Sequence, residues 1–197
     1  MNAKTIATTI VFASLTVVLN PAFTKMGIPA PYAPFLIYQI WEIPIVAAFL
    51  LIGPKSGVSI SILNAAVLLA LFPGALPTGP FYNLAAVLSM LLGIYTAHKL
   101  ITRGVSQEKA KNSTFQYGTK LITASTVLGI IFRVGIMTII NYALLRYPSP
   151  IGYSYPEGAI IYWVPLIGFF NATLALYTIP LGHLIAKAVS SNIKLHN

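Results

Sequence analysis

The stretch LITASTVLGIIFRVGIMTIINYALL, residues 121–145, decides how this sequence is to be interpreted. It is 25 residues long and almost wholly apolar, with Arg133 at its centre and Asn141 near its end. A helix of about 20 apolar residues crosses the core of a bilayer, so this segment is long enough to span with some tilt. A charge at mid-bilayer costs at least about 2.5–3.5 kcal/mol, so we expect the rest of the chain to supply a partner for Arg133.

Composition extends this interpretation to the whole chain. Of its 197 residues 57% are hydrophobic and 8% are charged, and the mean hydropathy is +0.81. Soluble domains carry about 25% charged residues, so we predict an all-α, polytopic, multi-pass protein of the cell membrane with one integral membrane domain over 1–197. The net charge of +9 would suggest a nucleic-acid partner in a soluble protein. Here we assign the basic residues to cytoplasmic loops and predict no nucleic-acid partner.

Apolar runs separated by breaker-rich or basic stretches predict six transmembrane helices. Their ranges are 5–19, 35–53, 58–72, 81–100, 121–145 and 159–189. The stretch 20–34 contains four prolines, so we expect a loop there. The first segment has the outline of a signal peptide, but no small-x-small cleavage site follows it, so we interpret it as a retained helix.

The distribution of basic residues predicts the orientation. Six spans place both termini on one side, and that side carries nine lysines and arginines against two on the other. Cytoplasmic loops are enriched in these residues, so we predict that both termini are cytoplasmic. The loops at 20–34, 73–80 and 146–158 then face outward.

Glu42 is the only acidic residue inside a predicted span, which makes it the candidate partner of Arg133. Charged residues within a membrane face the interior of the helix bundle and pair with one another. Three interpretations stay open: a buried ion pair that fixes helix register, a contribution to a polar ligand site, or a snorkelling arginine in a misplaced span.

Amide and aromatic side chains indicate a second set of candidates. Asn141 and Asn171 each offer two donors and an acceptor, which suits a neutral heterocycle. Hydrogen bonding between helices is the alternative, and we favour it for Asn64. Most aromatic residues fall at the predicted outer boundary, where an interfacial belt explains them. Trp41 and Tyr142 are our candidates for stacking on a flat ligand.

Several kinds of chemistry find no support in the sequence. There is no cysteine, no aspartate and no Walker motif, and no span holds paired carboxylates. His98, His183 and His196 show no metal-ligand spacing. We therefore predict that the protein is not an enzyme and has no metal site and no resident cofactor.

Short motifs in three places suggest a family. They are Gly53-Pro54-Lys55-Ser56-Gly57, the run of Arg133, Met137, Thr138 and Asn141, and the run of Pro165, Phe170 and Asn171. The first is similar to a GPxxG turn, and the others to an R…MT..N run and a P-F-N run. Together with six spans, these features resemble the substrate-binding (S) subunits of energy-coupling-factor (ECF) vitamin transporters, most closely the riboflavin-specific branch.

The resemblance implies a function that needs partners. An S subunit captures a vitamin, here riboflavin or a similar flat heterocycle, from outside, and the loop at 20–34 would close the pocket. A shared transmembrane coupling subunit and two ATPases then drive its release inside. Asn141 and Asn171 would contact the flavin. Small residues four apart on the first helix would dock on the coupling subunit: Ala3, Ala7, Thr9 and Ala13.

One departure from the riboflavin branch leaves the ligand open. That branch tends to carry a lysine one turn after the sixth-span asparagine, where this chain has Leu174. A thiamine precursor or a deazaflavin-like compound remains an alternative. Two other functions also stay open: a stand-alone small transporter or channel, for which we find neither inverted repeats nor paired acids, and a structural subunit of a membrane complex.

Overall fold

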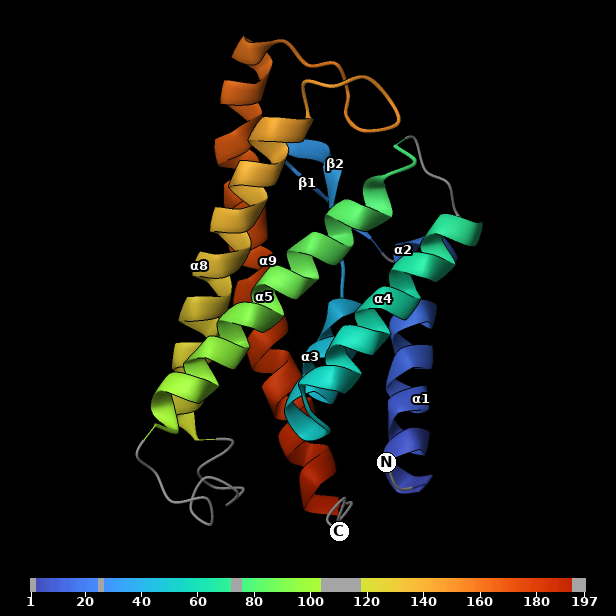
Figure 1. The fold of residues 1–197 in the computed structure, drawn as a ribbon, viewed down its shortest axis with the longest axis vertical. Helices are drawn as coiled ribbons and strands as arrows, with labels where there is room; N and C mark the ends of the chain where they lie inside the picture. The colour runs from blue at the N-terminus through green and yellow to red at the C-terminus, as the bar shows by residue number, and fades with distance from the viewer. Residues whose placement is uncertain (1–2, 25–26, 72–75, 104–117, 193–197) are drawn as a thin grey trace.

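The computed structural model describes residues 3–24, 27–71, 76–103 and 118–192 (Figure 1). These residues form seven helices and one two-stranded sheet. The elements are α1 (Ala3–Val18), α2 (Pro21–Thr24), β1 (Ile28–Ala30), β2 (Ala33–Tyr38), α3 (Glu42–Leu51), α4 (Pro54–Leu71), α5 (Gly79–Ile101), α8 (Thr119–Leu144) and α9 (Glu157–Asn192).

Four of these helices, α4, α5, α8 and α9, are long and apolar enough to cross a membrane. They coincide with the segments predicted at 58–72, 81–100, 121–145 and 159–189. Helices α1 and α3 are apolar but shorter, so the count of six spans stays a prediction. The start of α1 and the end of α9 lie at the same end of the molecule (Figure 1), and the assignment of that end to the cytoplasm stays a prediction.

Helix α8 is organised by a stripe of buried residues that recurs every four positions. The stripe consists of Leu121, Ser125, Gly129, Arg133, Met137 and Asn141. Residues four apart share one face of a helix, and α8 uses this face to pack against both α5 and α9. Polar residues in the stripe are therefore held inside the helix bundle.

The surface of the bundle carries large apolar side chains, whereas two charged residues lie inside it. Ile131, Ile139 and Leu184 are each more than half exposed, whereas Arg133 and Glu42 are only 2% and 1% exposed. Charged residues that face the interior and aliphatic residues that face outward are typical of a protein surrounded by lipid.

The predicted span at 35–53 is wrong in its first half, and the all-α prediction needs a correction with it. Residues 33–38 form strand β2, which pairs antiparallel with β1, and α3 begins only at Glu42. Pro34 and the β-branched and aromatic residues after it favour an extended backbone. A helix of ten residues is about 15 Å long, half of a bilayer core of about 30 Å.

The sixth predicted span is longer and less interrupted than expected. Helix α9 continues from Glu157 to Asn192 with Pro165 and Pro180 inside it. Prolines are tolerated in membrane helices because neighbouring groups satisfy the freed carbonyls. Helix α9 therefore runs without a break along the length of the bundle (Figure 1).

The Gly-Pro-Lys-Ser-Gly motif is explained by the tight turn between α3 and α4. Gly53 has a φ of +131°, which side chains disfavour, and Pro54 is the first residue of α4, where its missing N–H costs nothing. A Cβ on Gly57 would come 2.7 Å from the Cβ of Phe49, so this glycine lets the two helices approach closely.

We therefore expect Gly57→Ala to lower the free energy of unfolding by about 1–3 kcal/mol, the usual cost of overpacking. Thermal unfolding of the purified protein in detergent measures the effect. Gly79→Ala is the matched control, because a Cβ on Gly79, also in a helix, meets nothing within 4 Å. Equal stability of the two variants would show that α3 and α4 are not in close contact at this point.

Candidate functional site: a buried polar network

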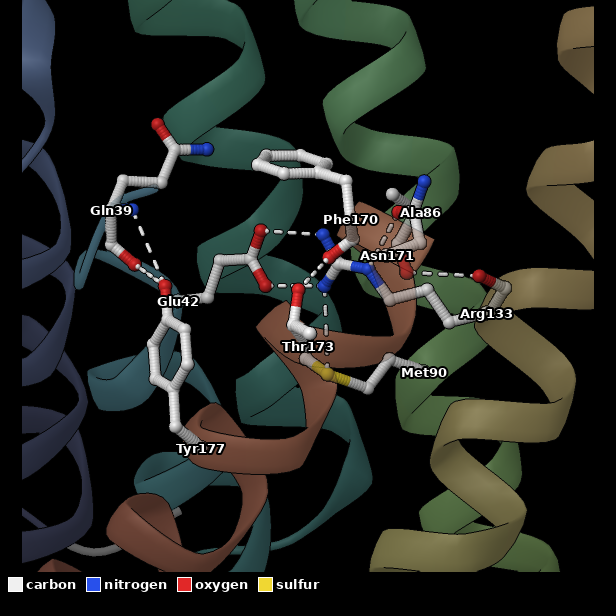
Figure 2. A network of polar contacts seen from close by, with 10 residues as sticks. Gln39, Glu42, Ala86, Met90, Arg133, Phe170, Asn171, Thr173 and Tyr177 are labelled. Atoms are coloured by element: carbon white, nitrogen blue, oxygen red, sulfur yellow. Dashed lines mark hydrogen bonds and ion pairs between the residues drawn. The ribbon is translucent and has the colours of Figure 1, made fainter. Parts of the chain in front are cut away.

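Arg133 is the centre of a buried network that joins three helices (Figure 2). Its Nη1 and Nη2 donate hydrogen bonds to Oε2 and Oε1 of Glu42, with Nη2 and Oε1 2.9 Å apart. Its Nε donates to Oδ1 of Asn171, also at 2.9 Å. The ion pair considered from the sequence is present, and the burial of Arg133 rules out snorkelling.

The network is fixed on several sides. The amide nitrogen of Asn171 donates to the carbonyl of Ile167, one turn earlier on α9, at 2.9 Å. The Sδ of Met90 on α5 lies 3.6 Å from Nη1 of Arg133. A bidentate arginine–carboxylate pair is specific in its geometry, so the network holds α3, α8 and α9 in one register. Its charges cancel, which leaves a polar but electrically neutral layer inside the bundle.

The other predicted ligand residues lie around this network at different distances. Asn141 is two turns from Arg133 on the buried stripe of α8, and its amide nitrogen donates to the carbonyl of Met137 at 2.7 Å. Trp41 directly precedes Glu42 and is 1% exposed; within the described residues its Nε1 has no hydrogen-bond partner.

Tyr142 is placed differently from these candidates. Its side chain is 43% exposed, and its hydroxyl donates to Oε1 of Glu157 at 2.9 Å. The guanidinium of Arg146 lies 4.9 Å from the centre of its ring. Tyr142 therefore contacts residues near the end of α8 and at the start of α9. It is not part of the network formed by Arg133, Glu42 and Asn171.

The hairpin formed by β1 and β2 is anchored beside the network. The hydroxyl of Tyr38 shares a hydrogen bond of 2.8 Å with Thr173 on α9, and that of Tyr32 shares one of 2.7 Å with Tyr38. The hydroxyl of Tyr177 donates to the carbonyl of Gln39 at 2.7 Å (Figure 2). The strand that leads into Glu42 is therefore attached to α9 close to Asn171.

The hydrogen bond between Tyr32 and Tyr38 does not depend on pH near neutrality. Burial of its phenol, followed by its hydrogen bond with Tyr38, raises the pKa of Tyr32 to about 12. The hydroxyl of Tyr32 therefore stays protonated and keeps its hydrogen bond throughout the neutral range.

Sequence reasoning misses the anchoring residues because nothing in their spacing marks them. Tyr38 and Thr173 are 135 positions apart, and Gln39 and Tyr177 are 138 apart. An interfacial belt accounts for most tyrosines when only the sequence is considered. The one signal for the anchor is the density of tyrosines around the predicted outer loops.

The four small residues proposed for docking do not share one face of α1. Ala3 and Ala7 are exposed, whereas Ala13 is buried at 9% exposure. Thr9 is half-buried, and its Oγ1 lies 3.4 Å from the Oγ of Ser56 on α4. In this structure only Ala3 and Ala7 of the four are open to a partner.

An apolar groove of about 250 Å³ lies elsewhere, between the start of α5 and the end of α8. Its lining is Thr78, Phe81, Tyr82, Ala85, Ile140, Leu144 and Ile151. None of the predicted ligand residues belongs to it. Among the described residues, no group of three or more His, Cys, Asp or Glu side chains is close enough together to hold a metal ion.

Comparison with known proteins identifies the fold. No protein-family model matches the chain, and no curated protein does. A solved structure described as "Structure and mechanism of the S component of a bacterial ECF transporter" is similar to 97% of this chain over 98% of its own length, with a TM-score of 0.71. The chain has the fold of that S component. At 22% sequence identity the likeness concerns the fold and leaves ligand and partners open.

Proposed function

We propose that this protein is the membrane-embedded substrate-binding subunit of an ECF-type uptake transporter, and that it binds riboflavin or a similar flat heterocycle. The observation that carries the proposal is the likeness in fold to an S component over nearly the full length of both chains. The motifs around Gly53, Arg133 and Asn171 support it independently, because they are short patterns of residue types and do not depend on the path of the backbone.

The buried network supports a ligand site on its outer side. Arg133 and Glu42 neutralise each other, so a site beside them would suit an uncharged ligand better than an ion. Asn171 links the arginine to α9, and Asn141 offers an amide two turns further along α8. We propose that these two asparagines recognise the polar edge of the heterocycle, with Trp41 and Tyr142 as further candidates for ring contacts.

The β1–β2 hairpin is our candidate for the cover of that site. It includes residues 28–34 of the loop that the family resemblance assigns to closing the pocket. Hydrogen bonds of tyrosine hydroxyls attach it to α9. A ligand held beneath it would leave only after these bonds open.

We expect Tyr38→Phe to speed dissociation of the ligand by roughly 5–30-fold, because it removes the hydrogen bonds to Thr173 and Tyr32 and each is worth about 1 kcal/mol. Stopped-flow fluorescence after dilution of the complex measures the rate. Tyr95→Phe is the control, since Tyr95 is an exposed residue of α5 away from the hairpin. Identical dissociation rates for Tyr38→Phe and the wild type would argue against the hairpin as a cover.

Transport itself requires partners in this proposal. A shared transmembrane coupling subunit and two ATPases would bind the S subunit and power release of the ligand inside. The part of α1 that exposes Ala3 and Ala7 is our candidate surface for the coupling subunit. Uptake by the reconstituted protein without any ATPase would instead favour a stand-alone transporter.

Mass spectrometry of the small molecules that co-purify with the protein tests the proposal. We expect a flavin or another flat heterocycle in roughly equimolar amount, which is released when the protein is denatured. A folded preparation that carries no such compound and binds none from a panel of flavins and thiamine precursors would favour a structural subunit.

A further inference from the structure

A second groove runs along the first part of α8, at the end of the molecule where α1 begins and α9 ends (Figure 1). Its volume is about 520 Å³, and its lining includes Thr119, Lys120, Thr123, Ala124, Val127 and Leu128. Val127 is 50% exposed, and Ala124 and Leu128 are half-buried. Because α8 is long and apolar enough to cross a membrane, this groove opens toward the lipid chains of a bilayer.

The two halves of this groove differ in chemistry. At the start of α8, Lys120 supplies an ammonium group, and Thr119 and Thr123 supply hydroxyl groups. Within the described residues, none of these three side chains makes a hydrogen bond or an ion pair. The other half of the lining is aliphatic. The groove therefore offers free hydrogen-bond donors at one end and an apolar surface along the rest of its length.

The length of the groove matches one leaflet of a bilayer. Along the axis of α8, the distance from Thr119 to Leu128 is about 14 Å. Half of a bilayer core is about 15 Å thick. At Leu128 the helices α5 and α8 are in close contact, because a Cβ on Gly93 would come 2.4 Å from the carbonyl oxygen of Leu128. The groove thus covers the depth that one lipid chain occupies in its leaflet.

The end of the molecule at which this groove begins is basic. The described helices place six lysines and arginines at or near their ends there: Lys4, Lys55, Lys99, Arg103, Lys120 and Lys187. The described residues contain two carboxylates, and neither is at this end. Glu42 is paired with Arg133 inside the bundle, and Glu157 begins α9 at the opposite end. Charge complementarity therefore favours a negatively charged occupant.

We propose that this groove binds one anionic phospholipid. The phosphate accepts hydrogen bonds from Lys120 and from the hydroxyls of Thr119 and Thr123, and one acyl chain lies along Ala124, Val127 and Leu128. Basic pockets between membrane helices bind anionic headgroups in this way. A free phosphate ion would make no use of the apolar half. A zwitterionic lipid would bring its own positive charge close to the surrounding lysines, so the net negative headgroup is preferred.

The groove between the start of α5 and the end of α8 provides a comparison within the same molecule. It is also apolar, and its lining contains Ala85 but no basic residue among the described residues. One of its hydroxyls is already in use, because Tyr82 donates to the carbonyl of Ile151 at 2.8 Å. We therefore expect this other groove to accept acyl chains without preference for a charged headgroup.

Native mass spectrometry of the purified protein in detergent tests this site. The protein is titrated with dioleoyl phosphatidylglycerol and, separately, with dioleoyl phosphatidylcholine, which has the same chains and no net charge. We expect one phosphatidylglycerol per chain to bind more tightly than phosphatidylcholine. Lys120→Gln should lower its affinity about 5-fold, the effect of one basic residue beside an anionic lipid. Lys187→Gln is the matched control, because Lys187 is exposed at the same end but outside the groove.

A second pair of variants tests the apolar half of the groove. Ala124→Leu fills it and should also weaken binding of phosphatidylglycerol, whereas Ala85→Leu fills the other groove and should leave that binding unchanged. Equal affinity of the wild type for the two lipids would overturn the proposal. So would equal affinity for phosphatidylglycerol in Lys120→Gln and Lys187→Gln. The test involves no vitamin, so its outcome is independent of the function proposed above.

Discussion

Arg133→Leu is expected to lower the free energy of unfolding by about 3–5 kcal/mol, the largest effect we predict for a single substitution. Most of this loss comes from the charge that is left behind, and less from the lost attraction between Arg133 and Glu42. Glu42 is 1% exposed, so without the guanidinium its carboxylate would be buried and uncompensated. Asn171 would also lose the donor that its Oδ1 accepts from. Chemical unfolding in mixed micelles, followed by tryptophan fluorescence, measures the effect.

A second substitution in the same pair separates the charge effect from packing. Because Arg133→Leu/Glu42→Leu removes both charges, we expect it to be more stable than Arg133→Leu alone. Arg146→Leu is the matched control, since Arg146 is exposed at the end of α8 and should change stability by less than about 0.5 kcal/mol. A double variant no more stable than Arg133→Leu would show that the two residues do not act as a pair.

Asn171→Ala is expected to weaken ligand binding by about 1–3 kcal/mol, or roughly 5–150-fold in Kd. It removes an amide from the proposed site and also frees the Nε of Arg133, whose orientation the amide fixes. We expect a similar loss for Asn141→Ala, which leaves the bonds of Arg133 in place. Isothermal titration calorimetry with the identified ligand measures both.

The control for these affinities is Asn192→Ala, in the exposed last turn of the same helix as Asn171. It should bind the ligand as the wild type does. Unchanged affinity in both Asn141→Ala and Asn171→Ala would place the ligand elsewhere in the molecule, and the assignment of these two residues would then be wrong.

The long apolar runs make most of the fold predictable. Helices α4, α5, α8 and α9 follow from segments that are too long and too apolar for a soluble domain. The stretch at 33–38 is assigned wrongly from the sequence because a short apolar run fits a strand and a buried helix equally well. Pairing with β1, which decides between the two, is a tertiary contact.

Within the candidate site, only the pairing of the two charged residues can be predicted from the sequence. The pairing of Arg133 with Glu42 can be anticipated because the predicted spans contain one arginine and one acid. The bridge from Arg133 to Asn171 cannot, because it depends on how α8 and α9 are rotated about their axes.

Titration of a flavin into the purified, ligand-free protein tests the proposed function most directly. We expect saturable quenching of flavin fluorescence at one flavin per chain, which weakens in Asn141→Ala and Asn171→Ala and is retained in Asn192→Ala. Binding of another flat heterocycle that competes at the same residues would keep the site and change the vitamin. A folded protein that leaves flavin fluorescence unchanged, and that binds no competing heterocycle, would contradict the assignment of this chain as a vitamin-binding subunit.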